Sequence, residues 1–189
     1  MSASSGLWKD RTVMTIDPAR SLLLVIDFQV RLMPAIHEGE LAVRNARRLT
    51  DAAALMGIPC LFTEQNAKGL GPTVDELMVP QDRLVHKQFF DACREEGFLA
   101  RIPADAHVVV LGCEAHVCAL QTVLGLLAAS RKTWVVRDAL GSRHPENKET
   151  ALRRMERHGA EIVTTEMVVF EWLQSAGNPQ FRQSVALIK

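Results

Sequence analysis

The fold is indicated most clearly by residues 108–118, which read VVVLGCEAHVC. The first part, Val108–Leu111, is a continuous apolar run of the kind found in strands that are buried on both faces of a parallel sheet. Gly112 then leads directly into a segment with helical spacing, so a buried strand runs into a helix here. Leu22–Ile26 is a second run of the same character. Both runs predict a parallel sheet covered by helices on its two faces.

Short apolar and β-branched runs alternate with longer helical segments along the chain. We predict strands at Ser21–Asp27, Ile58–Glu64, Arg83–Lys87, His107–Gly112, Thr133–Asp138 and Glu161–Thr165. Helices are expected at Glu40–Met56 and from Pro145 onward, ending at Gly57 and Gly159 respectively. Right-handed crossovers between parallel strands turn this pattern into a doubly wound, six-stranded α/β/α sandwich, Rossmann-like in form. Such folds bind ligands beyond the carboxyl ends of the strands.

The length and the net charge of the chain indicate how many domains it has and which kinds of partner it disfavours. The 189 residues suit one domain, which we place at 19–175, with an N-terminal arm at 1–18 and a C-terminal arm at 176–189. Lys plus Arg and Asp plus Glu both number 22, and this zero formal charge disfavours nucleic acid and membrane as partners. No apolar stretch approaches the roughly 18 residues of a membrane span. The N-terminus lacks a secretory pattern, so a cytoplasmic location is expected.

The predicted helix at Ala115–Ala129 carries apolar side chains on every side rather than along one stripe. They are Val117, Leu120, Val123, Leu124, Leu126 and Leu127. One face of a sheet cannot cover all sides of a helix. A homo-oligomer, in which a second subunit covers the rest, is therefore our hypothesis.

Three polar residues follow predicted strands and could meet at one edge of the sheet: Asp27, Lys87 and Cys118. Cys118 falls in or near the first turn of a helix, where unpaired N–H groups and the helix dipole lower a thiol pKa, as a nearby lysine also does. The same N–H groups could hold an oxyanion, and Asp27 could accept the thiol proton. Taken singly, each residue is weak evidence. An Asp after a strand is more often a helix cap or loop anchor, a Lys there is usually solvated, and a free Cys in an apolar helix is more often part of the core.

Several motifs together resemble the isochorismatase-like cysteine hydrolases, specifically the isochorismatase-domain-containing branch. They are Asp27-Phe28-Gln29, His86-Lys87 followed by Phe89-Phe90, and GCEAHVC at 112–118 with Gln121-Thr122. The resemblance covers roughly Ala19 to Leu173. It implies the strand order 3-2-1-4-5-6.

The resemblance also implies a site and a reaction. Asp27, Lys87 and Cys118 would form a catalytic triad, with a cis peptide bond before Glu114 and an oxyanion hole made by the Glu114 and Cys118 N–H groups. A small-molecule substrate with an amide or related C–N bond would then be cleaved through a thioester, without a cofactor. Lys87 leaves the third strand, about 10 Å from the first, so its side chain has to close that gap.

Two departures from relatives refine this expectation. Nicotinamidases of the superfamily carry a metal site of Asp and His after the second strand, whereas this chain has Thr63-Glu64-Gln65-Asn66. No metal is therefore expected. Isochorismatases that cleave a vinyl ether lack a cysteine at the nucleophile position, so Cys118 favours a covalent route. Phe28, Phe89 and Phe90 follow the proposed catalytic positions and are candidates for an apolar substrate pocket.

Two alternatives to a hydrolase remain open. The chain could respond to redox conditions through a Cys113–Cys118 disulfide, or it could be a catalytically silent binding or scaffold oligomer. Glu114 would oppose ionisation of a neighbouring thiol, so we expect its side chain to point away and to bond locally. We also expect an ion pair between Arg143 and Asp138.

Overall fold

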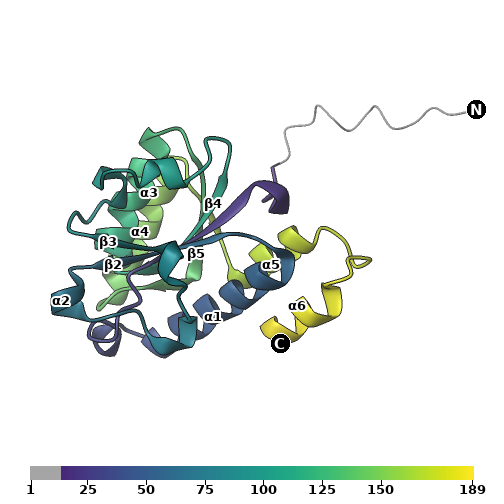
Figure 1. Cartoon of the computed structure of the whole chain (residues 1–189), viewed down its shortest axis with the longest axis horizontal. Coiled ribbons are helices and arrows are strands. Elements are labelled where there is room, and N and C mark those ends of the chain that lie inside the picture. Colours follow the sequence, from purple (N-terminus) through teal and green to yellow (C-terminus); the bar gives the residue numbers. More distant parts are fainter. Residues whose placement is uncertain (1–13) are drawn as a thin grey trace, which may run out of the picture.

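A computed structural model describes residues 14–189 and contains a six-stranded sheet in which every neighbouring pair is parallel. The order is β3-β2-β1-β4-β5-β6, as the resemblance implies. The strands are β1 (Ser21–Ile26), β2 (Cys60–Gln65), β3 (Leu84–Lys87), β4 (His107–Cys113), β5 (Lys132–Gly141) and β6 (Glu161–Val163). The predicted three-layer, Rossmann-like sandwich is confirmed (Figure 1).

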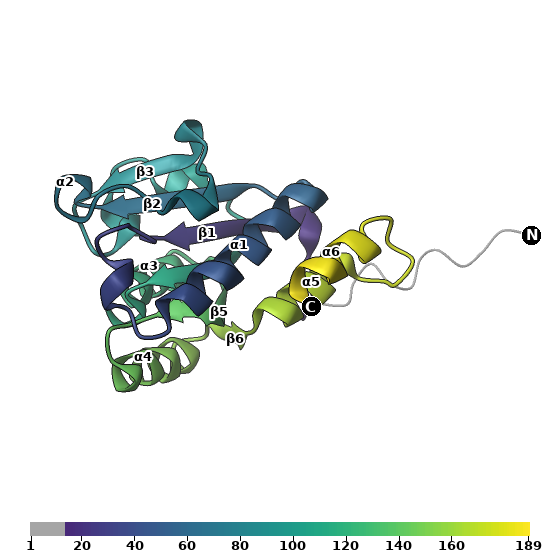
Figure 2. The ribbon, with the colours of Figure 1, turned by 90° about the horizontal axis from the view of Figure 1, so that it is seen from below.

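Helices cover both faces of the sheet (Figures 1 and 2). They are α1 (Gly39–Met56), α2 (Ala67–Leu70), α3 (Leu120–Ala128), α4 (Pro145–Arg157), α5 (Thr165–Leu173) and α6 (Phe181–Ile188). α1, α5 and α6 lie on one face, and α3 and α4 lie on the other. None of the helices that residues 14–189 form is long and apolar enough to cross a bilayer.

The core is divided in two by the sheet, because successive side chains of a strand point to opposite faces. In β1, Leu23 and Val25 pack into the cluster beneath α1 and α5, whereas Leu22 and Leu24 belong to the cluster beneath α3 and α4. Every residue of β1 and β4 is buried. The two central strands are thus buried on both faces, as their unbroken apolar runs predict.

Two glycines hold positions that disfavour or exclude a side chain. Gly57 ends α1 in the left-handed region, at φ 69°, as a C-cap glycine does. Gly112 in β4 has φ 147°, and a Cβ atom there would overlap the carbonyl oxygen of Ile26 in the neighbouring strand. β1 and β4 can therefore lie this close only because residue 112 has no side chain.

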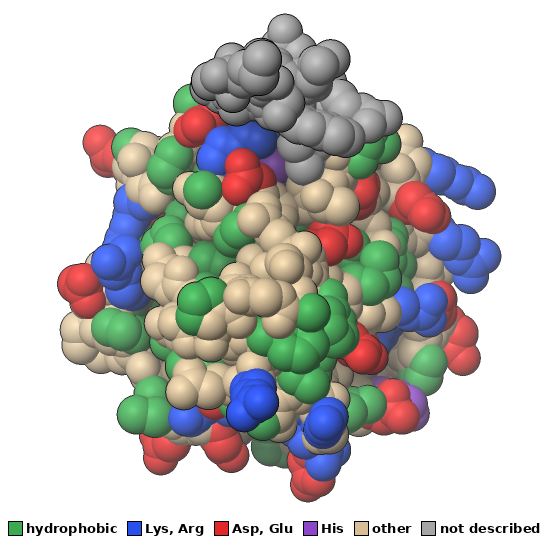
Figure 3. Space-filling model, turned by 90° about the vertical axis from the view of Figure 1, so that its right-hand side faces the viewer, with side chains coloured by type: hydrophobic (Ala, Val, Ile, Leu, Met, Phe, Trp, Pro, Cys, Tyr) green, Lys and Arg blue, Asp and Glu red, His purple; other side chains and the backbone are tan. Residues whose placement is uncertain are grey.

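Both ends of the described chain pack on the body of the protein. Residues 1–13 of the predicted N-terminal arm lie outside the described part, but Ile16 is buried and its N–H donates to Glu171 Oε2 at 2.7 Å. In the C-terminal segment, the ring of Phe181 lies 6.4 Å from that of Phe170 in α5. On the face that Figure 3 shows, acidic and basic side chains are interspersed, in keeping with the zero formal charge.

His107, at the start of β4, is a buried residue whose ionisation should make the stability of the protein depend on pH. Its buried ring packs against that of Trp134 at a tilt of 34°, with centroids 4.6 Å apart, and its Nδ1 accepts from the Asp17 N–H at 3.0 Å. Burial, first of all, lowers the pKa of His107 below 6.5. Below pH 6.5 the unfolded chain binds a proton at this histidine more readily than the folded protein does. The free energy of unfolding therefore decreases as the pH is lowered, by at most about 1.4 kcal/mol per pH unit.

We expect the urea midpoint of the wild type to fall more steeply between about pH 6.5 and 5 than that of His107→Gln. Glutamine keeps an acceptor for the Asp17 N–H but does not titrate. Parallel profiles for the two proteins would show that the buried ring does not control acid stability.

Candidate active site

The structure brings the carboxylate of Asp27 and the amine of Lys87 together at the carboxyl edge of the sheet. Asp27 follows β1 with φ 52°, and its Oδ1 accepts from the Thr63 hydroxyl at 2.6 Å. Lys87 Nζ lies 2.7 Å from Asp27 Oδ2, and the two side chains are 0% and 1% exposed. The gap between the third and first strands is therefore closed by the lysine side chain. Such a buried ion pair is held by hydrogen bonds around it, because desolvation opposes it.

Gln65, the last residue of β2, lies between the two strands that carry this pair. Its Oε1 accepts from Lys87 Nζ at 2.7 Å, and its Nε2 donates to the carbonyl of Gln88 at 2.8 Å. The backbone N–H of Gln65 donates to Oε1 of the buried Gln29, also at 2.8 Å. Sequence reasoning did not single out Gln65 as a site residue, although its place at the end of a strand beside the Asp27 strand was the signal.

Cys118 completes the group from the other side. It lies in a single π-helical turn, Ala115–Ala119, that joins β4 to α3. Its Sγ is 3.9 Å from Gln65 Oε1, and the residue is 6% exposed. Asp27, Lys87 and Cys118, which are far apart in the sequence, therefore lie together at the carboxyl edge of the sheet.

The ionisation of Cys118 differs from our expectation. Burial, followed by the negative charge of Asp27, raises the pKa of the Cys118 thiol to about 12, although Lys87 acts in the opposite direction. The prediction of a lowered pKa was wrong because desolvation by the surrounding core outweighs the lysine and the helix terminus. The resting group is a thiol, so a base has to take its proton during any attack.

The peptide bond between Cys113 and Glu114 is cis, as the resemblance implies. The side chain of Glu114 turns to Arg143, whose Nε donates to Glu114 Oε1 at 2.9 Å, so the expected local bond is confirmed. The expected Arg143–Asp138 ion pair was wrong. Asp138 Oδ1 instead accepts from the backbone N–H and the hydroxyl of Thr165, at 2.8 and 3.1 Å.

The three phenylalanines lie in different surroundings. Phe28 is fully buried in the cluster beneath α1 and α5, so it fills the core. Phe89 and Phe90, which follow Lys87, are 48% and 51% exposed. The guanidinium of Arg94 lies 5.4 Å from the centre of the Phe89 ring, within reach of a cation–π contact. Only the latter two are therefore on the surface beside the candidate site.

The remaining features of this region are the relation of Cys113 to Cys118 and the side chains that could bind a metal ion. Cys113 packs beneath α1, whereas Cys118 packs beneath α3, so the sheet lies between the two thiols, and both are free. The proposed disulfide has no support in this arrangement. Within residues 14–189, no three side chains of His, Cys, Asp or Glu cluster so as to hold a metal ion.

Comparison with known proteins identifies the family. The model of the isochorismatase domain family matches residues 21–167, which include all three residues of the candidate site. The chain belongs to the isochorismatase family. Its fold is that of an isochorismatase-family hydrolase.

Relatives agree over most of the chain. Isochorismatase domain-containing protein 1 of Danio rerio is 35% identical over 181 residues, which are 94% of this chain but only 64% of the relative's length. A solved structure of MAR1 ribonuclease from Caenorhabditis elegans is 32% identical, covers 92% of both chains and has a TM-score of 0.85. YcaC of Escherichia coli, described as an octameric hydrolase of unknown specificity, is 22% identical with a TM-score of 0.83 and covers 94% of this chain and 89% of its own.

Proposed function

We propose that this isochorismatase-family protein is a cysteine hydrolase that cleaves a small amide or related C–N bond without a metal. The observation that carries the proposal is the buried group of a thiol, a carboxylate and an ammonium at the carboxyl edge of the sheet. A nucleophile and a base, beside N–H groups of a helix start, are the parts that acyl transfer needs.

In the first half of the reaction, Asp27 takes the proton of the Cys118 thiol while the sulfur attacks the carbonyl carbon. The carbonyl oxygen becomes an oxyanion, which the N–H groups of Glu114 and Cys118 would stabilise. When the C–N bond breaks, Asp27 returns the proton to the leaving nitrogen, and a thioester remains on Cys118. The raised pKa of the thiol supports this order of events, because the thiolate has to be formed with the help of Asp27.

In the second half, water attacks the thioester carbon and gives a proton to Asp27. The C–S bond then breaks, the acid leaves, and the proton passes from Asp27 to the sulfur. Lys87 keeps its proton throughout, and its position 2.7 Å from Asp27 stabilises the carboxylate form. One water is consumed, and one acid and one amine or ammonia are released.

Metal independence is supported by the residues that follow β2. Glu64, at a position near that of metal ligands in nicotinamidases, uses its Oε1 to accept from the N–H and hydroxyl of Thr73, at 2.7 and 2.9 Å. Gln65 is engaged with Lys87 in the same way. These side chains are occupied in holding the loops together.

The size of the substrate follows from burial. Asp27 and Lys87 are each 1% exposed and Cys118 is 6% exposed, so only a small group reaches the sulfur. The name of the C. elegans neighbour refers to a ribonuclease, an activity for which this chain is poorly suited. A chain with zero formal charge attracts a polyanion poorly, and a buried thiol does not reach a phosphodiester backbone.

A homo-oligomer is part of the proposal. Val117, Leu124 and Leu127, which point outward on the nucleophile's helix, are only partly covered within one chain. The octameric state stated for the E. coli neighbour is in keeping with such an assembly. A second copy would bury these side chains, which is the hydrophobic gain that drives association.

The test is to trap the thioester. We expect ammonia or amine release from at least one member of a panel of small amides and ureido compounds. Rapid acid quenching should then reveal a mass increase equal to the acyl group on the Cys118 peptide. Cys113→Ala is the matched control and should keep both turnover and adduct, whereas Cys118→Ala should lose both. Turnover that persists in Cys118→Ala, or no turnover with any compound, would contradict the proposal and favour a silent binding protein.

A further inference from the structure

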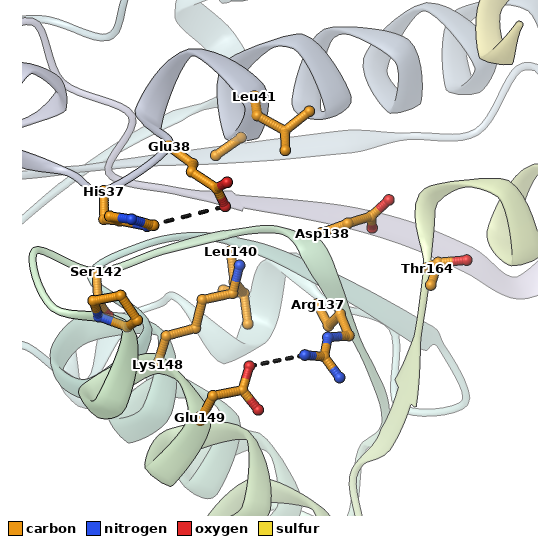
Figure 4. A pocket seen from close by; sticks show the side chains of 12 residues that line it. His37, Glu38, Leu41, Arg137, Asp138, Leu140, Ser142, Lys148, Glu149 and Thr164 are labelled. Atoms are coloured by element: carbon orange, nitrogen blue, oxygen red, sulfur yellow. Dashed lines mark hydrogen bonds and ion pairs between the residues drawn. The ribbon is translucent and has the colours of Figure 1, made fainter.

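A separate cavity of about 300 Å³ lies between the start of α1, the end of β5 and the start of α4. This volume is at the lower end of the range of ligand pockets in proteins. Figure 4 shows polar residues converging from the start of α1 and from the β5–α4 region, which are far apart in the sequence. Asp27, Lys87 and Cys118 do not line this cavity.

Lys148 of α4 extends its side chain into this cavity. In Figure 4 the side chain rises from α4 toward α1, with its amine pointing toward Glu38. Within residues 14–189, the amine has no carboxylate within 4.0 Å and takes part in no hydrogen bond, whereas its neighbour Glu149 is paired with Arg137 at 2.8 Å. The amine is therefore left available to a ligand.

The surroundings of Lys148 make its amine lose a proton more readily than that of an ordinary lysine. Burial, then the positive charge of Arg137, lowers the pKa of Lys148, although Glu38, Glu149 and Asp138 act in the opposite direction. The remaining titratable group that faces the cavity is His37, which lies 4.0 Å from Glu38 Oε2. A lysine whose amine loses its proton more readily is the kind that forms Schiff bases.

The walls of the cavity indicate the class of ligand. Leu41, Ala42 and Leu140 provide an apolar side, which suits a short carbon skeleton. Arg137 is paired with Glu149, so Lys148 is the one cation among the described lining residues that remains to bind an anion. The carboxylate of Asp138 accepts hydrogen bonds from Thr165. Glu38 adds a negative charge. An uncharged ligand fits this balance better than a carboxylate or a phosphate.

We propose that this cavity is a second ligand site, at which Lys148 binds a small uncharged aldehyde or ketone as an imine. The nitrogen lone pair forms a C–N bond to the carbonyl carbon, and a proton moves to the oxygen. The hydroxyl then takes a proton from solvent and leaves as water, and the carboxylate of Glu38 accepts the remaining N–H proton as the C=N bond forms. The step needs no oxidant or reductant, and water reverses it.

The test traps the imine by reduction. The full chain is incubated at pH 7 with butanal and sodium cyanoborohydride, and the modified lysines are mapped by peptide mass spectrometry. We expect Lys148 to be alkylated at least tenfold faster than the exposed Lys68 and Lys132. Equal rates at the three lysines would overturn the proposal.

Two variants separate a site from a merely reactive side chain. Leu41→Trp should fill the cavity from a position that is 38% exposed, so it should reduce alkylation of Lys148 at least fivefold while leaving Lys68 unchanged. Lys148→Arg should abolish the label in this peptide and leave hydrolysis at Cys118 unaffected. Undiminished labelling of Lys148 in Leu41→Trp would show that no ligand site is involved. Because neither variant touches the candidate triad, the outcome is independent of the proposed hydrolase activity.

Discussion

Replacing Asp27 by asparagine is expected to abolish hydrolysis and, at the same time, to make Cys118 easier to alkylate. Loss of a general base costs about 10²- to 10⁴-fold in rate. The same change removes a negative charge that raises the pKa of Cys118, while Gln65 Oε1 still holds the ammonium of Lys87. Each unit by which the pKa falls gives about ten times more thiolate, and about three- to fourfold faster alkylation, since a weaker base is also a weaker nucleophile.

The measurement is the rate constant for iodoacetamide at each cysteine, by peptide mass spectrometry at about pH 8. Cys93 serves as the internal control, because burial and Asp91 raise its pKa to about 12 and Asp27 is not among the causes. Its rate should not change in Asp27→Asn. If alkylation of Cys118 falls together with hydrolysis, Asp27 acts by holding the fold of the site and is not the base.

The second large effect concerns stability. Lys87→Met is expected to lower the free energy of unfolding by about 3–5 kcal/mol, because it leaves the carboxylate of Asp27 buried without its counter-ion. The double variant Asp27→Asn/Lys87→Met should recover most of this loss, since a buried ion pair replaced by neutral groups is often no less stable. All three variants, including Asp27→Asn alone, should be inactive.

A double-mutant cycle in urea checks this, with Lys68→Met as the control for loss of an exposed lysine. That control should stay within about 0.5 kcal/mol of the wild type. Additive effects of the two single changes would show that the pair is not coupled in the folded protein. A large coupling, with a double variant that is inactive but nearly as stable as the wild type, would show that the pair is kept for chemistry rather than for stability.

Much of the fold could be predicted from the sequence, because the unbroken apolar runs at Leu22–Ile26 and Val108–Leu111 are typical of strands with two covered faces. The meeting of Asp27 with Cys118 follows from adjacent parallel strands that end at one edge. The contact of Lys87 with Asp27 could not be predicted in this way, because β2 lies between their strands and the lysine side chain has to extend past its end.

Other features depend on tertiary surroundings that no local pattern contains. The direction of the Cys118 pKa shift is set by desolvation, which depends on how fully the core closes over the sulfur. The partner of Arg143 depends on the path of the loop after β5, which brings it to Glu114 rather than Asp138. The cavity at Lys148 could not be predicted because it forms only where the start of α1 meets the β5–α4 region, which is distant in the sequence.

The lack of space for a side chain at Gly112 limits which substitutions evolution and protein engineering can use. Because a side chain at this position would strike Ile26, which precedes Asp27, a single substitution here is expected to separate the base from the nucleophile without touching either. Selection at this codon therefore acts on geometry and is independent of the substrate. New specificities are expected to arise from changes in the exposed residues after Lys87, such as Phe89 and Phe90, and a mutant library for this scaffold should vary those positions and keep residue 112 constant.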